Sequence, residues 1–154
     1  MNKYFSLVIV LFIAFSSCTK DATFDPVKQA KADDAAIQAY IATKNITATK
    51  DASGLYYSVI TAGNGAYPSL TSSVNVDYEG ELLNGTVFSP TSNLSYPLVG
   101  LIKGWQIGLP YINTGGTILL IVPSGLAYGN SSPGGGIPLN AVLVFTIKLV
   151  NFSN

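Results

Sequence analysis

Two segments of strict alternation constrain the fold of this chain more than any other feature. In VNVDYEGEL, one face carries the apolar and small residues Val74, Val76, Tyr78, Gly80 and Leu82. In AVLVFTIKLVNF, one face carries the apolar residues Leu143, Phe145, Ile147 and Leu149. A repeat of two residues is that of a β-strand with one buried face. Both segments therefore predict strands that cover a common core.

Other segments extend this sheet. LYYSVITAG (residues 55–63) and TILLIVPS (residues 117–124) are β-branched, apolar runs typical of strands. In LLNGTVF, Asn84-Gly85 predicts a two-residue hairpin turn. LIKGWQIGLPYI spaces Ile102, Trp105 and Leu109 as a short helix ending near Pro110. We expect an α+β fold, an antiparallel sheet with one short internal helix.

The acidic residues of the first alternating strand, Asp77, Glu79 and Glu81, share its other face. A metal-binding or catalytic cluster is one interpretation. We interpret them instead as the solvent-facing side of an antiparallel strand, which alternation requires.

A helix is predicted over residues 26–44. Asp25 can cap it and Pro26 suits its first position. One narrow apolar stripe runs along it, formed by Ala30, Ile37, Tyr40 and Ile41. We expect this helix to pack on the domain or to space it from a membrane, and a dimerising coiled coil is the alternative.

The N-terminus is typical of an export signal. Lys3 precedes an apolar run over residues 4–15 and then small residues, and this run is too short to span a bilayer. FSSC resembles the lipoprotein box in which the cysteine becomes the lipidated first residue, here Cys18. We expect a signal peptide at 1–17 and a lipidated tether at 18–25, hence an exported bacterial lipoprotein on a periplasm-facing membrane or the cell surface. The alternative is an ordinary signal with an incidental cysteine. CTKD resembles the lysine–acid signal that sends some lipoproteins to the cell surface, but we interpret this segment as a solvated linker.

Composition excludes several kinds of chemistry. The chain of 154 residues has no histidine and no arginine, and Cys18 is its single cysteine. A histidine–cysteine metal site, a Ser-His-Asp triad and bidentate arginine recognition of phosphate are therefore excluded. The formal charge is zero, which does not favour a nucleic-acid partner. We expect no metal and no cofactor.

Several motifs together resemble the FKBP-type peptidyl-prolyl cis–trans isomerases. They are VNVDYEGELLNGTVF, LIKGWQIGL, GGTILLIVPSGLAYG and GIPLNAVLVFTIKL, in family order across roughly residues 70 to 152. The preceding helix and SGLYYSVITAG resemble the lipoprotein branch. The resemblance implies a twisted antiparallel sheet wrapped around one short helix at residues 53–154, preceded by an N-terminal helix and linker at 26–52.

The resemblance also implies a proline-binding pocket. Its catalytic residues would be Tyr128, through its hydroxyl, Ile102, through its backbone N–H, and Tyr78. The remaining pocket residues would be Phe88, Ser89, Tyr96, Leu101, Trp105, Ile137 and Phe145. The implied partners are X–Pro segments of unfolded or exported proteins and rapamycin-type macrolides. A lipid anchor at Cys18 would make the membrane a further partner.

One position departs from the family pattern. The family usually places aspartate directly after the phenylalanine at the position of Phe88, where this chain has Ser89 followed by Pro90. Serine brings no charge, so reduced activity is expected. The functional alternatives are a non-catalytic proline-segment binding module or holdase chaperone on the same fold, and a structural surface lipoprotein with a vestigial pocket.

Overall fold

A computed structural model describes residues 24–154, apart from the side chains of residues 91–93. The expected signal peptide, Cys18 and most of the tether lie outside the described residues. The α-helices are α1 (Pro26–Lys44) and α2 (Lys103–Gly108), and short 3-10 turns are η1 (Leu98–Gly100), η2 (Leu109–Tyr111) and η3 (Ser124–Leu126). The strands are β1 (Thr49–Lys50), β2 (Tyr56–Thr61), β3 (Ser73–Leu82), β4 (Val87–Pro97), β5 (Thr117–Val122) and β6 (Leu143–Ser153).

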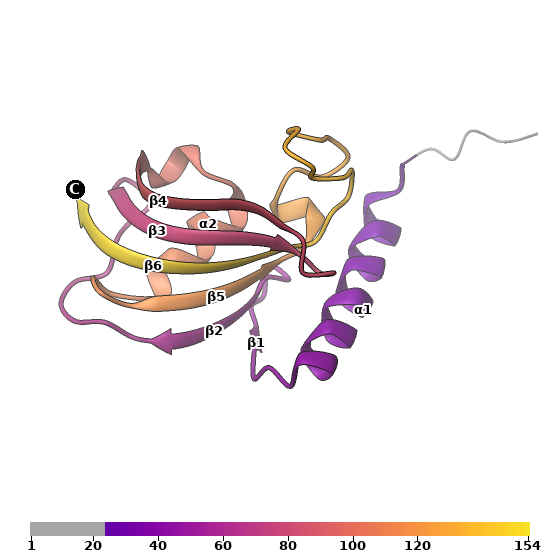
Figure 1. Cartoon of the computed structure of the whole chain (residues 1–154), viewed down its shortest axis with the longest axis horizontal. Coiled ribbons are helices and arrows are strands. Elements are labelled where there is room, and N and C mark those ends of the chain that lie inside the picture. Colours follow the sequence, from indigo (N-terminus) through magenta and orange to yellow (C-terminus); the bar gives the residue numbers. More distant parts are fainter. Residues whose placement is uncertain (1–23) are drawn as a thin grey trace, which may run out of the picture.

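The described strands form one antiparallel sheet in the order β1-β2-β5-β6-β3-β4. The C-terminal strand β6 lies inside the sheet between β5 and β3, and α2 lies over one face (Figure 1). The expected α+β class, an antiparallel sheet around one short helix, is confirmed. The segment expected to be a linker supplies β1, which pairs with β2.

Both alternating segments form the strands that their period predicts. Val74 and Val76 of β3 and Ile147 and Leu149 of β6 are fully buried in the core between sheet and α2. Glu79 is exposed on the opposite face of β3. Glu81 accepts a hydrogen bond from the Tyr40 hydroxyl of α1 at 3.1 Å. Within residues 24–154, no cluster of histidine, cysteine or acidic side chains could hold a metal ion.

Helix α1 begins and ends where the sequence predicts and packs on the domain. The Asp25 carboxylate caps it by accepting from the N–H groups of Val27 and Lys28. Ile37 is fully buried among side chains that include Tyr56 of β2 and Val144 of β6. The helix lies beside one end of the sheet (Figure 1). No helix among the described residues is long and apolar enough to cross a bilayer.

The β3–β4 hairpin differs from the expected two-residue turn at Asn84-Gly85. The Gly85 N–H donates to the Leu82 carbonyl at 2.8 Å, which centres the turn on Leu83 and Asn84. Gly85 follows the turn with a φ of 84°, a conformation that favours glycine. The prediction was wrong because a longer hairpin connection also needs a glycine, one position later in the turn.

Candidate active site

A cavity of about 390 Å³ opens between the sheet, α2 and the β5–β6 loop. We call it the aromatic cavity. It is lined by Tyr78, Phe88, Ser89, Leu94, Gly100, Leu101, Ile102, Trp105, Tyr128, Pro133, Gly134, Gly135, Ile137 and Phe145. No lysine, aspartate or glutamate is among these residues. The structure thus brings together every pocket residue expected from the resemblance except Tyr96.

Aromatic rings from four elements form the wall. Trp105 of α2 meets Tyr78 of β3 edge to face at 5.0 Å and Phe145 of β6 at 5.3 Å between ring centroids. Phe88 of β4 meets Phe145 at 5.8 Å in the same manner. Such edge-to-face pairs are stabilising beyond the area they bury. Trp105 and Phe145 are almost fully buried, so this wall is rigid and apolar.

Glycines make room for these rings. A Cβ at Gly80 would lie 2.6 Å from the Phe88 ring and 3.0 Å from the Phe145 ring. A Cβ at Gly104 of α2 would lie 2.5 Å from the Val122 side chain of β5. Since real Cβ contacts are longer, glycine at both positions lets the rings, and α2 with its tryptophan, approach the sheet. The alternation placed Gly80 on the inward face but did not reveal this role.

A β-bulge turns two consecutive residues of β4 toward the cavity. Gly80 pairs with Ser89 and Glu81 pairs with Val87, which leaves Phe88 as the extra residue. A regular strand would point Phe88 and Ser89 to opposite faces, whereas both line the cavity. Ser89 Oγ lies 3.0 Å from the Tyr78 hydroxyl oxygen, and either group can donate the hydrogen bond.

The β5–β6 loop supplies Tyr128 and Ile137. Ile137 is buried, and its N–H donates to the Gly134 carbonyl at 3.2 Å. Tyr128 is 40% exposed at the cavity. Burial and the neighbouring Tyr78 raise the pKa of the Tyr128 hydroxyl above its usual value. The hydroxyl therefore stays protonated, and able to donate, throughout the neutral range.

Ile102 lies at the N-terminus of α2, where Gln106 holds the adjacent peptide. Gln106 Nε2 donates to the Leu101 carbonyl at 2.7 Å and to the Val99 carbonyl at 3.0 Å. The C=O and N–H of a trans peptide point in opposite directions. The Ile102 N–H therefore points away from Gln106, a residue that the motif did not single out.

Tyr96 lies outside the lining of the aromatic cavity. It pairs with Val74, one inward position farther along β4 than Leu94, which lines the cavity in its place. The Tyr96 ring lies against Gly100, where an added Cβ would be 2.5 Å from its Cε1 atom. Its ring is 48% exposed at the end of the sheet. Leu94, Gly100, Pro133, Gly134 and Gly135 were not foreseen from the sequence.

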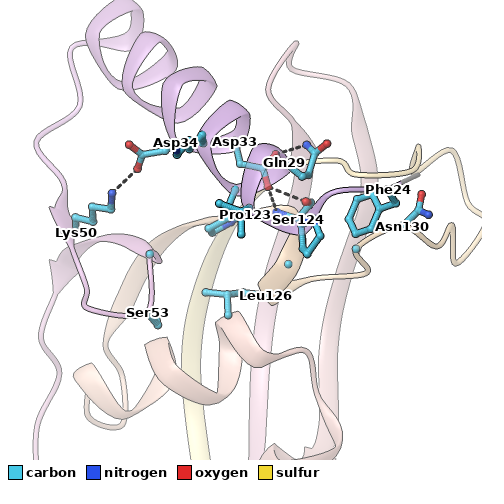
Figure 2. A pocket seen from close by; sticks show the side chains of 17 residues that line it. Phe24, Gln29, Asp33, Asp34, Lys50, Ser53, Pro123, Ser124, Leu126 and Asn130 are labelled. Carbon is cyan, nitrogen blue, oxygen red and sulfur yellow. Dashed lines mark hydrogen bonds and ion pairs between the residues drawn. The ribbon is translucent and has the colours of Figure 1, made fainter. Parts of the chain in front are cut away.

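A second, larger cavity of about 640 Å³ lies between α1 and η3 (Figure 2). We call it the α1 cavity. Its acidic side chains already have partners: Asp34 contacts Lys50 at 2.5 Å, and Asp33 accepts from Ser124. The aromatic set lies elsewhere, so the aromatic cavity is the candidate active site.

The fold and the aromatic cavity define a class of α+β domain in which an antiparallel sheet and one short helix enclose a ring-lined pocket. The family model of the FKBP-type peptidyl-prolyl cis-trans isomerases matches residues 65–150. This chain therefore belongs to the FKBP-type peptidyl-prolyl cis-trans isomerase family, as its motifs indicate.

Curated relatives agree with this assignment. The chain is 40% identical over 115 residues to the peptidyl-prolyl cis-trans isomerase Mip of Coxiella burnetii, covering 71% of this chain and 50% of Mip. It is 41% identical over 102 residues to the FKBP-type isomerase FkpA of Escherichia coli K12, covering 64% of this chain and 37% of FkpA. The chain thus spans half or less of the length of these relatives.

Solved structures show the same fold. The crystal structure of FkpA from Escherichia coli superposes with a TM-score of 0.72 at 34% identity, covering 82% of this chain and 62% of that chain. A peptidyl-prolyl cis-trans isomerase from Pseudomonas syringae pv. tomato superposes with a TM-score of 0.70 at 29% identity, covering 86% of this chain and 99% of that chain.

Proposed function

We propose that this protein is a peptidyl-prolyl cis–trans isomerase that acts on X–Pro bonds in the aromatic cavity. The observation that carries the proposal is the ring-lined cavity with Tyr128 at its edge, in a chain of this family. The proline ring of a substrate would occupy the space between Trp105, Phe145 and Ile137.

The reaction suits a site without groups that ordinarily titrate near neutral pH. Rotation about a peptide bond costs about 18–20 kcal/mol, because amide resonance is lost in the twisted state. No bond is made or broken, so the catalyst needs only to bind the twisted amide better than the planar amide. The planar amide is the more charge-separated form, and an apolar cavity disfavours it.

Two donors would hold the twisted carbonyl. The Tyr128 hydroxyl is protonated in the neutral range, since its pKa is raised by burial and by Tyr78. The Ile102 N–H is oriented by the hydrogen bond from Gln106 to the Leu101 carbonyl. Because both donors are held in place before the reaction, they can stabilise the charge on the twisted carbonyl without having to move.

The substrate class follows from the lining. Without lysine, aspartate or glutamate in the lining, the cavity has no charged side chain to bind a charged residue before proline. We therefore propose that the aromatic cavity binds X–Pro segments of unfolded or exported proteins as substrates. We propose that rapamycin-type macrolides bind in the same cavity.

The proposed location is a bacterial envelope membrane. It is supported by the sequence pattern of an export signal at residues 1–17, followed by Cys18. We propose that residues 18–25 are a tether, that residues 26–52 are α1 and its linker, and that residues 53–154 are the catalytic domain. A relative from Legionella longbeachae, 41% identical over 103 residues, carries the name outer membrane protein MIP. The protein would then assist the folding of exported proteins beside the membrane.

A second candidate function is a proline-segment binding module or holdase chaperone. Ser89 favours it, because a neutral partner for Tyr78 replaces the aspartate that is usual in the family. A protease-coupled assay with an X–Pro peptide separates the two functions. Faster cis–trans conversion with purified protein supports the isomerase, and peptide binding without faster conversion supports the binding module.

A further inference from the structure

A buried carboxylate joins the N-terminal helix to the loop that carries Tyr128. Asp33 of α1 is only 3% exposed. The Ser124 N–H and hydroxyl donate to Asp33 Oδ2 at 2.8 Å and 2.7 Å, and Gln29 Nε2 donates to Oδ1 at 2.7 Å (Figure 2). Asp33 and Ser124 are 91 positions apart in the chain.

Ser124 in turn holds the backbone on both sides of Tyr128. Its carbonyl accepts from the Ala127 N–H at 3.0 Å and from the Gly129 N–H at 2.8 Å. The two amides that flank Tyr128 therefore depend on one carbonyl group. The position of that carbonyl depends on the contact between Ser124 and Asp33.

Two side chains of this loop, Leu126 and Ala127, pack against the hydrophobic core, and the loop otherwise borders open space. Gly125, Leu126, Gly129 and Asn130 form a wall of the α1 cavity, while Tyr128 lines the aromatic cavity. The loop is thus a thin partition between two cavities. Because open space borders the loop at both cavities, its hydrogen bonds add to the packing of Leu126 and Ala127 in restraining it.

We propose that Asp33 is a positioning residue for Tyr128, and that α1 is part of the catalytic unit rather than only a tether. This inference rests on the proposed isomerase function for its effect on activity. Asp33 holds Ser124, Ser124 holds Ala127 and Gly129, and these place the Tyr128 hydroxyl at the cavity.

The neighbouring acid provides a matched control. Asp34 also docks α1, but it accepts from the Tyr56 hydroxyl of β2 at 2.8 Å and contacts Lys50 of β1. Neither partner belongs to the Tyr128 loop. An effect of weakened α1 docking in general should therefore appear in Asp34→Ala as well, whereas loss of Tyr128 positioning should follow only from changes at Asp33.

The test compares Asp33→Ala, Asp33→Asn and Asp34→Ala in the full chain. We expect Asp33→Ala to lower kcat/KM by about fivefold and by no more than Tyr128→Phe does, because misplacing a catalytic group lowers the rate and Asp33 acts only through the Tyr128 hydroxyl. Asp33→Asn keeps an acceptor and should retain most activity, as should Asp34→Ala, because the partners of Asp34 lie outside the Tyr128 loop. On a Tyr128→Phe background, Asp33→Ala should have no further effect on kcat/KM, because the hydroxyl that it positions is gone.

Amide hydrogen exchange gives a readout that does not depend on catalysis. Asp33→Ala should speed exchange at Ala127 and Gly129, and Asp34→Ala should leave exchange at both amides unchanged. Equal losses of activity in Asp33→Ala and Asp34→Ala, or unchanged exchange at Ala127 and Gly129 in Asp33→Ala, would overturn the proposal. A wild type without isomerase activity would refute the proposed function instead, while the exchange result would still decide whether Asp33 holds the loop.

Discussion

The Tyr78 hydroxyl and Ser89 Oγ lie 3.0 Å apart across the β3–β4 bulge, at the wall of the aromatic cavity. Both groups are neutral, and both face the space proposed for the prolyl bond. A serine thus keeps the hydrogen bond to the pocket tyrosine but supplies no charge.

We predict that Ser89→Asp raises kcat/KM on an X–Pro peptide. Hydrogen bonds to charged groups contribute about 1.5–3 kcal/mol, against about 1 kcal/mol for neutral pairs. A gain of about 1–2 kcal/mol in transition-state binding corresponds to roughly a five- to thirtyfold higher rate. Tyr78 is already in place to donate to the new carboxylate.

Two effects at position 89 oppose this gain in activity, and a second variant tests one of them. A buried carboxylate costs free energy unless Tyr78 or water solvates it, and Pro90 restricts the backbone that would aim it. The double variant Ser89→Asp with Pro90→Ser relieves that restriction. A wild type as active as aspartate-bearing relatives, with no gain in either variant, would show that position 89 does not limit catalysis.

Trp105 should report ligand binding, because it is the single tryptophan of the chain and lines the aromatic cavity. A rapamycin-type macrolide or a proline peptide should change its emission at saturation. Phe145→Ala removes a ring in contact with Trp105 and should abolish the response. That truncation should also lower the free energy of unfolding by about 3–5 kcal/mol.

A milder variant separates binding from stability. Phe145→Leu keeps an apolar side chain of similar reach, and it should weaken the response while leaving the domain folded. Emission typical of a water-exposed indole, unmoved by saturating ligand in the wild type, would be inconsistent with a pocket floored by Trp105.

We predict that kcat/KM is flat between about pH 6 and pH 9, because no group with an ordinary pKa in that range lines the cavity. The Tyr128 hydroxyl donates while protonated, and its raised pKa extends the active range upward. Activity should fall only as pH rises through that pKa, and Tyr128→Phe should remove this alkaline fall. A bell-shaped profile with a midpoint inside the range would contradict the proposed roles.

Membrane anchoring through Cys18 stays a prediction, since that residue lies outside the described part of the chain. Cys18→Ala should release the protein from the membrane fraction, while far-ultraviolet circular dichroism of the released protein matches that of the wild type. Recovery of the variant with membranes, together with an unmodified N-terminus in the wild type, would exclude the anchor.

Regular periods made much of the fold predictable from sequence. Strands β3 and β6 alternate over long stretches with one buried face, and Asp25-Pro26 marks the start of α1. The β4 bulge was not predictable, because one inserted residue leaves no period. The position of the hairpin turn, which differs by one residue, and the short strand β1 were also not predictable, because neither has a distinct sequence pattern.

The candidate site likewise combines residues that periodicity predicts with residues that it does not predict. Periodicity placed Tyr78 and Phe145 on inward faces, but Tyr128 and Ile137 lie in an irregular loop and were expected only from the family resemblance. Tyr96 was misplaced, because its distance from the cavity depends on the β3–β4 register. The contact of Asp33 with Ser124 joins segments 91 positions apart, which no local pattern reports.

The most direct test of the central claim is the rate of cis–trans exchange in a proline peptide, followed by NMR exchange spectroscopy without a coupling protease. We predict that catalytic amounts of the wild type accelerate exchange, and that Tyr128→Phe lowers kcat/KM about five- to tenfold, because one of two donors to the twisted carbonyl is lost. A wild type that binds the peptide but leaves exchange at its uncatalysed rate would contradict the isomerase function.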